Sequence, residues 1–208
     1  MAQTAPAPTT AQGGAARHPR IGILAVQGDV REHARALVEV GAEPVDVRLP
    51  RDLVGLDALI LPGGESTTMR KLIDRYGLRD PIVAMSQGGA PVYGTCAGMI
   101  LLANRIADGD EPVLGLLDIT VQRNAYGRQL DSFEADVEIP SLGGAPMHAV
   151  FIRAPVVSEV GAEVEVLARD PDGRPIAVRQ GRVLATAFHP ELTPDRRLHR
   201  LLLELIEP

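Results

Sequence analysis

The segment 91–101, PVYGTCAGMIL, constrains the fold more than any other part of the chain. A short apolar run leads to Gly94, Cys96 follows, and an apolar run of helical character begins after it. A side chain between two glycines at a strand-to-helix turn projects from the tip of the strand, an arrangement called a nucleophile elbow. The segment therefore predicts an α/β fold with a thiol at a strand end, where the helix N-terminus favours the thiolate.

The same cysteine also has a plainer interpretation. A lone cysteine is often a small buried hydrophobic residue, and Cys96 is the only one in 208 residues. A single cysteine excludes disulfides within the chain and cysteine-rich metal sites, so we expect a cytoplasmic protein. The choice between a nucleophile and a core residue depends on the other motifs.

The first half of the chain alternates between strand and helix patterns. Nearly continuous apolar runs predict buried strands at 20–26, 58–61 and up to Gly94, and a shorter strand is expected at 44–47. Helices are predicted after Asp29, from Ser66 as the capping residue, from Asp80-Pro81, and from Ala97 to about Ile106. This order predicts a doubly wound α/β fold, with a mostly parallel central sheet and helices on both faces.

The second half shows a different pattern. Short alternating segments predict strands at 119–122, 133–139, 149–153, 164–169, 176–180 and 182–188, with hairpin turns at Asp172-Gly173 and Gln180-Gly181. They predict an antiparallel extension in the C-terminal half. A last helix, from Pro194 onward, places Leu198, Leu201, Leu202 and Leu205 on one face.

Composition argues against secreted, nucleic-acid-binding and membrane proteins. Residues 1–20 lack apolar periodicity and the apolar core of a signal peptide, so we expect a disordered tail followed by one domain at 21–208. Aromatic residues make up only 3% and the net charge is −6, which argues against a nucleic-acid partner. No apolar run reaches the roughly 18 residues of a membrane span.

Two glycines follow the predicted strand at 58–61. In the loop Pro62-Gly63-Gly64-Glu65-Ser66, the glycines let the backbone approach a ligand and turn N–H groups toward it. The carboxyl ends of parallel strands are where open α/β sheets bind ligands. A tight connection without a ligand is the alternative.

The histidine at 189 has a carboxylate two residues away. In Phe188-His189-Pro190-Glu191, proline restricts the residue before it to extended geometry, in which residues two apart point to the same side. A carboxylate on one imidazole nitrogen would leave the other free to take a proton from a thiol. His148 is a weaker competitor, and His33 and His199 are expected on helices.

Together these motifs predict a Cys96, His189 and Glu191 triad for acyl transfer. The oxyanion would be bound by the N–H of Ala97, the residue after the nucleophile, and by Gly64. The intermediate would be a thioester, so the substrate is an amide or an ester. These residues do not identify the acyl group.

Five longer blocks carry a resemblance: 24–33 (LAVQGDVREH), 61–70 (LPGGESTTMR), 123–134 (RNAYGRQLDSFE), 150–155 (VFIRAP) and 188–193 (FHPELT). With Gly-Thr-Cys-Ala-Gly, they resemble triad-type glutamine amidotransferases, and most closely the family of glutaminase subunits of pyridoxal phosphate synthase. The resemblance implies a flavodoxin-like class I glutamine amidotransferase fold from about Ile21 to the C-terminus.

The resemblance also implies a substrate and a partner. L-glutamine would be bound by Gly64, Glu65, Ser66, Arg123, Ile152 and Arg153, and its ammonia would pass to a separate synthase subunit. That subunit is a (β/α)8 barrel in the family, where a large ring of synthase subunits carries the glutaminases. No metal or organic cofactor is expected. The alternatives are a stand-alone hydrolase of the same fold and a non-catalytic scaffold subunit.

Overall fold

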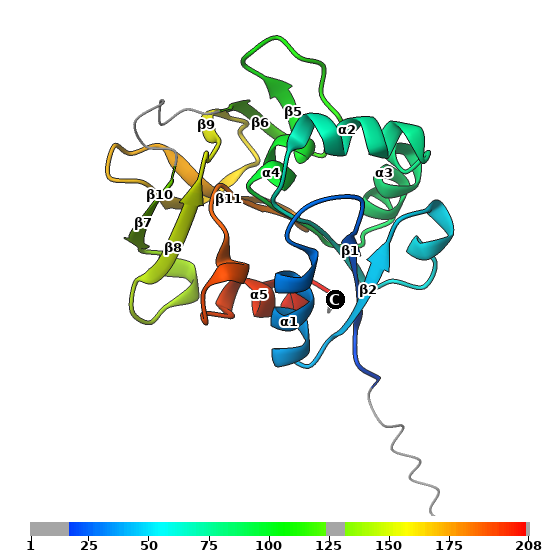
Figure 1. The fold of residues 1–208 in the computed structure, drawn as a ribbon. Coiled ribbons are helices and arrows are strands. Elements are labelled where there is room, and N and C mark those ends of the chain that lie inside the picture. Colours follow the sequence, from blue (N-terminus) through cyan, green and yellow to red (C-terminus); the bar gives the residue numbers. More distant parts are fainter. Residues whose placement is uncertain (1–16, 124–131, 207–208) are drawn as a thin grey trace, which may run out of the picture.

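A seven-stranded mixed sheet forms the centre of the molecule (Figure 1). The computed structural model describes residues 17–123 and 132–206. The strand order is β10-β11-β12-β4-β3-β1-β2, and the run from β12 to β2 is parallel throughout. Its strands are β1 (Arg20–Leu24), β2 (Glu43–Val47), β3 (Ala58–Leu61), β4 (Val92–Thr95) and β12 (Val183–Thr186). All residues of β3, β4 and β12 are buried, as expected for parallel strands covered on both faces.

Helices cover both faces of this sheet. α1 (Val30–Glu39) and α5 (Arg197–Glu204) lie side by side on one face, and α2 (Ser66–Arg75), α3 (Arg79–Gln87) and α4 (Ala97–Leu102) lie on the other (Figure 1). Leu198 and Leu202 of α5 are fully buried, which confirms that the last helix packs back on the core. The doubly wound, mostly parallel architecture predicted from the sequence is confirmed.

The remaining strands divide into three pieces, in which only the pair of β5 and β6 is parallel. β10 (Glu165–Arg169) and β11 (Pro175–Gln180) extend the main sheet in antiparallel fashion, as predicted. β7 (Ser132–Val137) and β8 (Met147–Ile152) form a separate pair. A third sheet contains β5 (Ala103–Ile106), β6 (Leu117–Gln122) and β9 (Val156–Val160). Short 3-10 turns occupy Pro50–Leu53, Pro140–Leu142 and Pro190–Leu192.

Several predicted boundaries were wrong. The helix expected to reach Ile106 ends at Leu102, because the backbone N–H groups of Leu114 and Leu116 bond to the carbonyls of Leu101 and Leu102 and the chain continues as β5. β9 was not predicted. Glu65, not Ser66, caps α2, and Leu78 precedes α3, so Asp80 and Pro81 lie inside its first turn.

The N-terminal boundary also differs from the prediction. Residues 1–16 of the predicted tail lie outside the described residues, as does most of the 123–134 block. Arg17, however, pairs with Asp57 at 2.6 Å, and Arg20 begins β1, so residues 17–20 belong to the fold. Among the helices formed by residues 17–123 and 132–206, none has the length and apolar character required to cross a bilayer.

Candidate active site

Cys96 lies at a sharp turn between β4 and α4. Its backbone has φ 49° and ψ −104°, a conformation that non-glycine residues rarely adopt. The turn is held by two backbone hydrogen bonds: the Cys96 N–H donates to the Thr186 carbonyl at 2.8 Å, and the Cys96 carbonyl accepts from Met99 at 3.0 Å. The predicted elbow is therefore present, with its strain at the cysteine itself. Strain of this kind is concentrated at functional sites.

The two flanking glycines allow close packing. A Cβ at Gly94 would lie 2.5 Å from the carbonyl carbon of Gly98, and a Cβ at Gly98 would lie 2.0 Å from the carbonyl oxygen of Leu61. Neither distance is possible for a real side chain. The glycines therefore bring the start of α4 against β3 and β4, which fixes where Cys96 projects.

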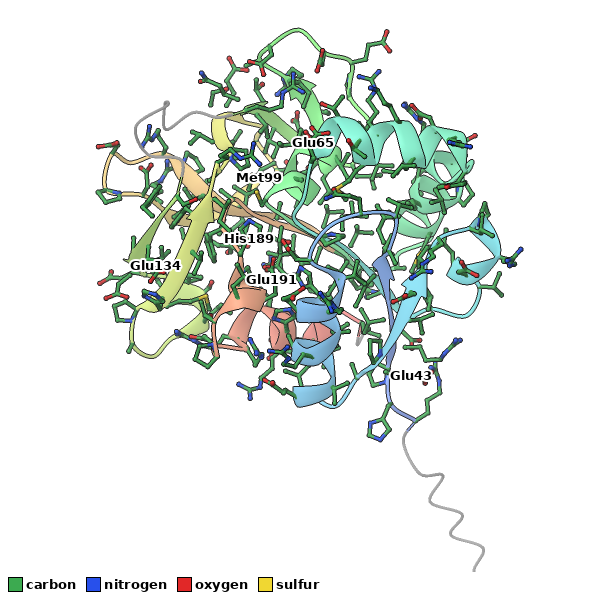
Figure 2. The ribbon with its side chains drawn as sticks, viewed as in Figure 1. Glu43, Glu65, Met99, Glu134, His189 and Glu191 are labelled. Carbon is green, nitrogen blue, oxygen red and sulfur yellow. The ribbon has the colours of Figure 1, made fainter. Side chains whose placement is uncertain are left out.

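His189 and Glu191 form the predicted pair. His189 Nδ1 lies 2.8 Å from Glu191 Oε1, and both side chains are buried near the start of α1 (Figure 2). The predicted geometry was wrong in one respect: Glu191 lies in the 3-10 turn Pro190–Leu192, not in an extended segment. His189 is held by its N–H, which donates to the Val150 carbonyl at 2.9 Å. Its Nε2 has no hydrogen-bond partner among the described residues.

The surroundings favour a protonated His189. Burial lowers the pKa of His189, but the Asp29 and Glu191 carboxylates beside Nδ1 and the nearby Cys96 side chain outweigh it and raise that pKa above its usual value. Burial raises the pKa of Glu191, and the contact with His189 opposes that shift. Cys96 and His189 line the same cavity, as a cysteine nucleophile and its base require.

One cavity of about 480 Å³ brings the predicted site residues together. Of the ten residues that the sequence assigned to the site, nine line it: Gly64, Glu65, Ser66, Cys96, Ala97, Arg123, Ile152, Arg153 and His189. Glu191 lies behind His189. Cys96 Sγ is 3.7 Å from the carbonyl oxygen of Ile152. Among the described non-glycine residues, only Cys96 and Arg153 have positive φ, and both line this cavity.

The Gly63-Gly64 loop is held by Gln27. The side-chain oxygen of Gln27 accepts from the Glu65 N–H at 2.8 Å, and a Cβ at Gly64 would lie 2.4 Å from that same oxygen. The Glu65 side chain turns away to cap α2, accepting from Thr67 and Thr68. Bonds from Thr68 and Thr67 lower the pKa of Glu65 to about 2. These bonds fill three of the four acceptor sites of the carboxylate and leave one, on Oε1, for a ligand.

Arg123 enters the cavity with acidic partners. Its Nε donates to Asp108 at 2.9 Å and its Nη2 to Asp110 at 2.6 Å, and these bonds raise its pKa. A guanidinium has five N–H donors, so three are left for a ligand carboxylate. Asp108 also lines the cavity.

The sequence prediction missed Asp29. It was interpreted as a helix cap, but its side chain makes no capping bond and lies 3.3 Å from His189 Nδ1. Its place, two residues after Gln27 at the carboxyl edge of the sheet, could have indicated a site residue. Asp29, His189 and Glu191 are the only group within the described ranges that could hold a metal. His189 Nδ1 cannot do so while it donates its proton to Glu191.

His148, the competing histidine, lies elsewhere. It is exposed on the β7 and β8 pair, where it contacts Glu134 at 2.8 Å and Asp136 at 3.3 Å. These acids raise its pKa. It does not line the cavity that contains Cys96.

Known proteins resemble this chain in sequence. A family model described as the SNO glutamine amidotransferase family matches residues 23–207. "Pyridoxal 5'-phosphate synthase subunit PdxT" of Frankia alni is 57% identical over 190 residues, which cover 90% of this chain and 95% of that protein. The subunit of the same name from Acidothermus cellulolyticus is 57% identical over 194 residues, or 90% and 94% of the two chains.

Solved structures show the same fold. A "glutamine amidotransferase" crystal structure superposes with a TM-score of 0.85 at 51% identity, covering 90% of this chain and 99% of that one. PurLQS from Thermotoga maritima superposes with a TM-score of 0.68 at 19% identity, covering 92% of this chain and 100% of that one. The second likeness concerns the fold alone.

Proposed function

Because the chain belongs to the SNO glutamine amidotransferase family, we propose that it is the glutaminase subunit of a pyridoxal 5'-phosphate synthase, with Cys96, His189 and Glu191 as its triad. It hydrolyses L-glutamine to L-glutamate and ammonia. The observation that carries the proposal is the single cavity in which the thiol, the imidazole and an arginine meet. One glutaminase domain, from about residue 17 to 208, performs this reaction.

The reaction passes through a thioester. His189 Nε2 holds the proton taken from the Cys96 thiol, so Cys96 Sγ attacks the side-chain amide carbon of glutamine as a thiolate. His189 then gives that proton to the departing nitrogen, which leaves as ammonia. Water then attacks the thioester carbon, His189 takes its proton, and the thiol is restored as glutamate leaves. Glu191 orients His189 throughout. The N–H groups of Ala97 and Gly64 bind the oxyanion.

The substrate would lie along the cavity wall. The carboxylate of glutamine is matched by the remaining donors of Arg123, while Gly64, Glu65, Ser66, Ile152 and Arg153 contact the rest. Because Gln27 already accepts from the Glu65 N–H, binding at that loop involves Gln27 as well.

The Arg123→Ala chain is expected to raise KM for glutamine about 10-fold to 100-fold with little change in kcat. A charge-assisted hydrogen bond contributes roughly 1.5–3 kcal/mol. Steady-state kinetics with the synthase present measure this. Arg179→Ala is the control, since Arg179 pairs with Glu165 at 2.6 Å on the antiparallel edge of the main sheet. An unchanged KM in Arg123→Ala would remove Arg123 from the substrate site.

The partner is a synthase subunit that receives the ammonia. We propose that it is a (β/α)8 barrel and that several copies form a ring carrying the glutaminases, in the cytoplasm, where a lone reactive thiol stays reduced. The names of the relatives, each a subunit of pyridoxal 5'-phosphate synthase, support a partner of this kind.

The hydrogen bond from Glu65 to Gln27 suggests how the partner affects activity. We infer that docking reorients this loop and completes the oxyanion site, with Gln27 as a contact in the change. Gln27→Ala is expected to lower synthase-dependent turnover about 10-fold, the effect of roughly one hydrogen bond. Rates with and without synthase measure it. Full synthase-dependent activity in this variant would contradict the role.

Two alternatives have distinct consequences. A stand-alone hydrolase would turn over glutamine or a larger amide equally well without a partner. A non-catalytic scaffold subunit would turn over neither, although Cys96, His189 and Glu191 are all in place.

The test of the proposal is direct detection of the intermediate. Glutamine is added to the chain with its synthase, the reaction is quenched in acid, and the intact mass is measured. One glutamyl group on the wild-type chain and none on Cys96→Ala is the expected result. A wild-type chain that turns over glutamine without a cysteine adduct, together with an active Cys96→Ala chain, would refute the mechanism.

A further inference from the structure

Two buried histidines lie behind the triad and have no part in the mechanism described above. His33 on α1 and His199 on α5 are both fully buried, and His33 Nδ1 lies 3.2 Å from His199 Nε2. The other ring nitrogen of His33, Nε2, lies 3.1 Å from Thr95 Oγ1 and 3.5 Å from Glu191 Oε2. His33 therefore touches both the residue before the nucleophile and the third member of the triad.

Both histidines are neutral at neutral pH. Burial, with smaller contributions from His199, His189 and Arg196, lowers the pKa of His33 well below its usual value. Burial and Arg196 lower the pKa of His199 to about 4, although Glu39 opposes the shift. A neutral imidazole has one donor and one acceptor nitrogen, so the direction of each hydrogen bond matters.

One pair of tautomers fits every contact of the His33 and His199 ring nitrogens. His199 Nε2–H donates to His33 Nδ1, and His33 Nε2–H then points toward Thr95 and Glu191. This assignment leaves His199 Nδ1 as an unprotonated nitrogen, and that atom has no hydrogen-bond partner among the described residues. The reverse arrangement would place a bare His33 nitrogen against a carboxylate oxygen, which is repulsive.

Glu191 needs such a donor. Its Oε1 accepts from His189, but its buried Oε2 has no regular hydrogen bond within residues 17–123 and 132–206. An unsatisfied buried carboxylate oxygen costs free energy and favours protonation of the acid. A protonated Glu191 could not stabilise the imidazolium that forms on His189.

We propose that His33 is a positioning residue of the glutaminase reaction: its Nε2–H orients the Glu191 carboxylate and keeps it ionised, and His199 fixes the tautomer of His33. This inference rests on the proposed function. The ionisable groups around the two residues are His189, His199, Arg196, Asp29 and Tyr93. None of them changes in the variants below.

The test compares His33→Leu with His33→Gln. The leucine variant removes the donor, whereas the glutamine amide replaces it. The first readout is alkylation of Cys96, the only cysteine, by iodoacetamide between about pH 5 and pH 8. Loss of the donor makes Glu191 easier to protonate. The acid limb of the profile, in which the alkylation rate falls as the pH decreases, therefore moves to higher pH. Reactivity at pH 6 is expected to fall about 10-fold in His33→Leu, equivalent to one pK unit, and to stay near wild type in His33→Gln.

The second readout is turnover of glutamine with the synthase. His33→Leu is expected to lower kcat about 10-fold, by the same argument, with KM unchanged. Leu37→Ala is the matched control, because Leu37 is also fully buried on α1 and packs in the hydrophobic core. It should lower the unfolding midpoint and leave the acid limb in place.

The outcomes separate this inference from the proposed function. An acid limb in His33→Leu that coincides with wild type, or one that moves equally in His33→Gln and Leu37→Ala, would overturn the positioning role. A wild-type chain with no glutamine turnover would instead overturn the proposed function, and the alkylation profiles would still report on His33.

Discussion

The Cys96→Ala chain is expected to release glutamate from glutamine at least about 10⁴-fold more slowly than wild type, because no other group in the cavity can form the thioester. Asp29, the remaining acid near His189, cannot replace a thiolate there, since it lies on the Nδ1 side of the ring. The measurement is glutamate formation at saturating glutamine with the synthase present. Both chains are compared at the same complex concentration.

Stability serves as the control for this variant. Alanine at position 96 keeps the Cβ and removes one buried sulfur atom, so we expect the unfolding midpoint to change by only a few degrees. Cys96→Gly removes the conformational strain and is expected to be equally inactive. Residual turnover above about one thousandth of wild type in either folded variant would contradict Cys96 as the nucleophile.

The Gly98→Ala chain is expected to lose about 3 kcal/mol of unfolding free energy, the upper end of the usual range for overpacking. The added methyl would lie 2.0 Å from the carbonyl oxygen of Leu61, and backbone atoms cannot move aside as a flexible side chain can. This loss lowers the unfolding midpoint by roughly 6–12 °C for a chain of this size. Thermal unfolding followed by circular dichroism measures it.

Gly88→Ala is the control for the general effect of replacing a glycine by alanine, without overpacking. Gly88 ends α3 at φ −72°, which alanine adopts freely, and its nearest neighbours would be 3.3 Å from the new Cβ. We expect a change within about 1 kcal/mol for this variant. Equal midpoints for Gly98→Ala and Gly88→Ala would show that α4 does not depend on the close approach to β3.

Local sequence patterns predicted the central sheet because its strands are buried on both faces. A run such as Ala58–Leu61 has no polar residue, as is typical of a strand buried on both faces. The end of α4 was not predictable in the same way. Residues 99–103 are apolar throughout and suit a helix. The chain leaves the helix at Ala103 because residues 114–117, which lie beyond the local pattern, bond to the Leu101 and Leu102 carbonyls and pair with Ala103.

The residues of the candidate site likewise fall into those that a local sequence pattern reveals and those that it does not. Cys96, His189 and Glu191 could be found because each has a local pattern: flanking glycines, or a carboxylate two residues away. His33 has no such pattern. It occupies an ordinary buried position of α1, and its meaning depends on Glu191 and His199, which lie more than 150 residues later in the chain.

Glutamate release by the wild-type chain, measured alone and with its synthase subunit, tests the central claim most directly. We expect turnover that requires both the synthase and Cys96, with ammonia retained for the synthase reaction. Equal turnover without the synthase would contradict the coupled glutaminase and indicate a stand-alone hydrolase. No turnover in either condition would contradict the glutaminase function itself.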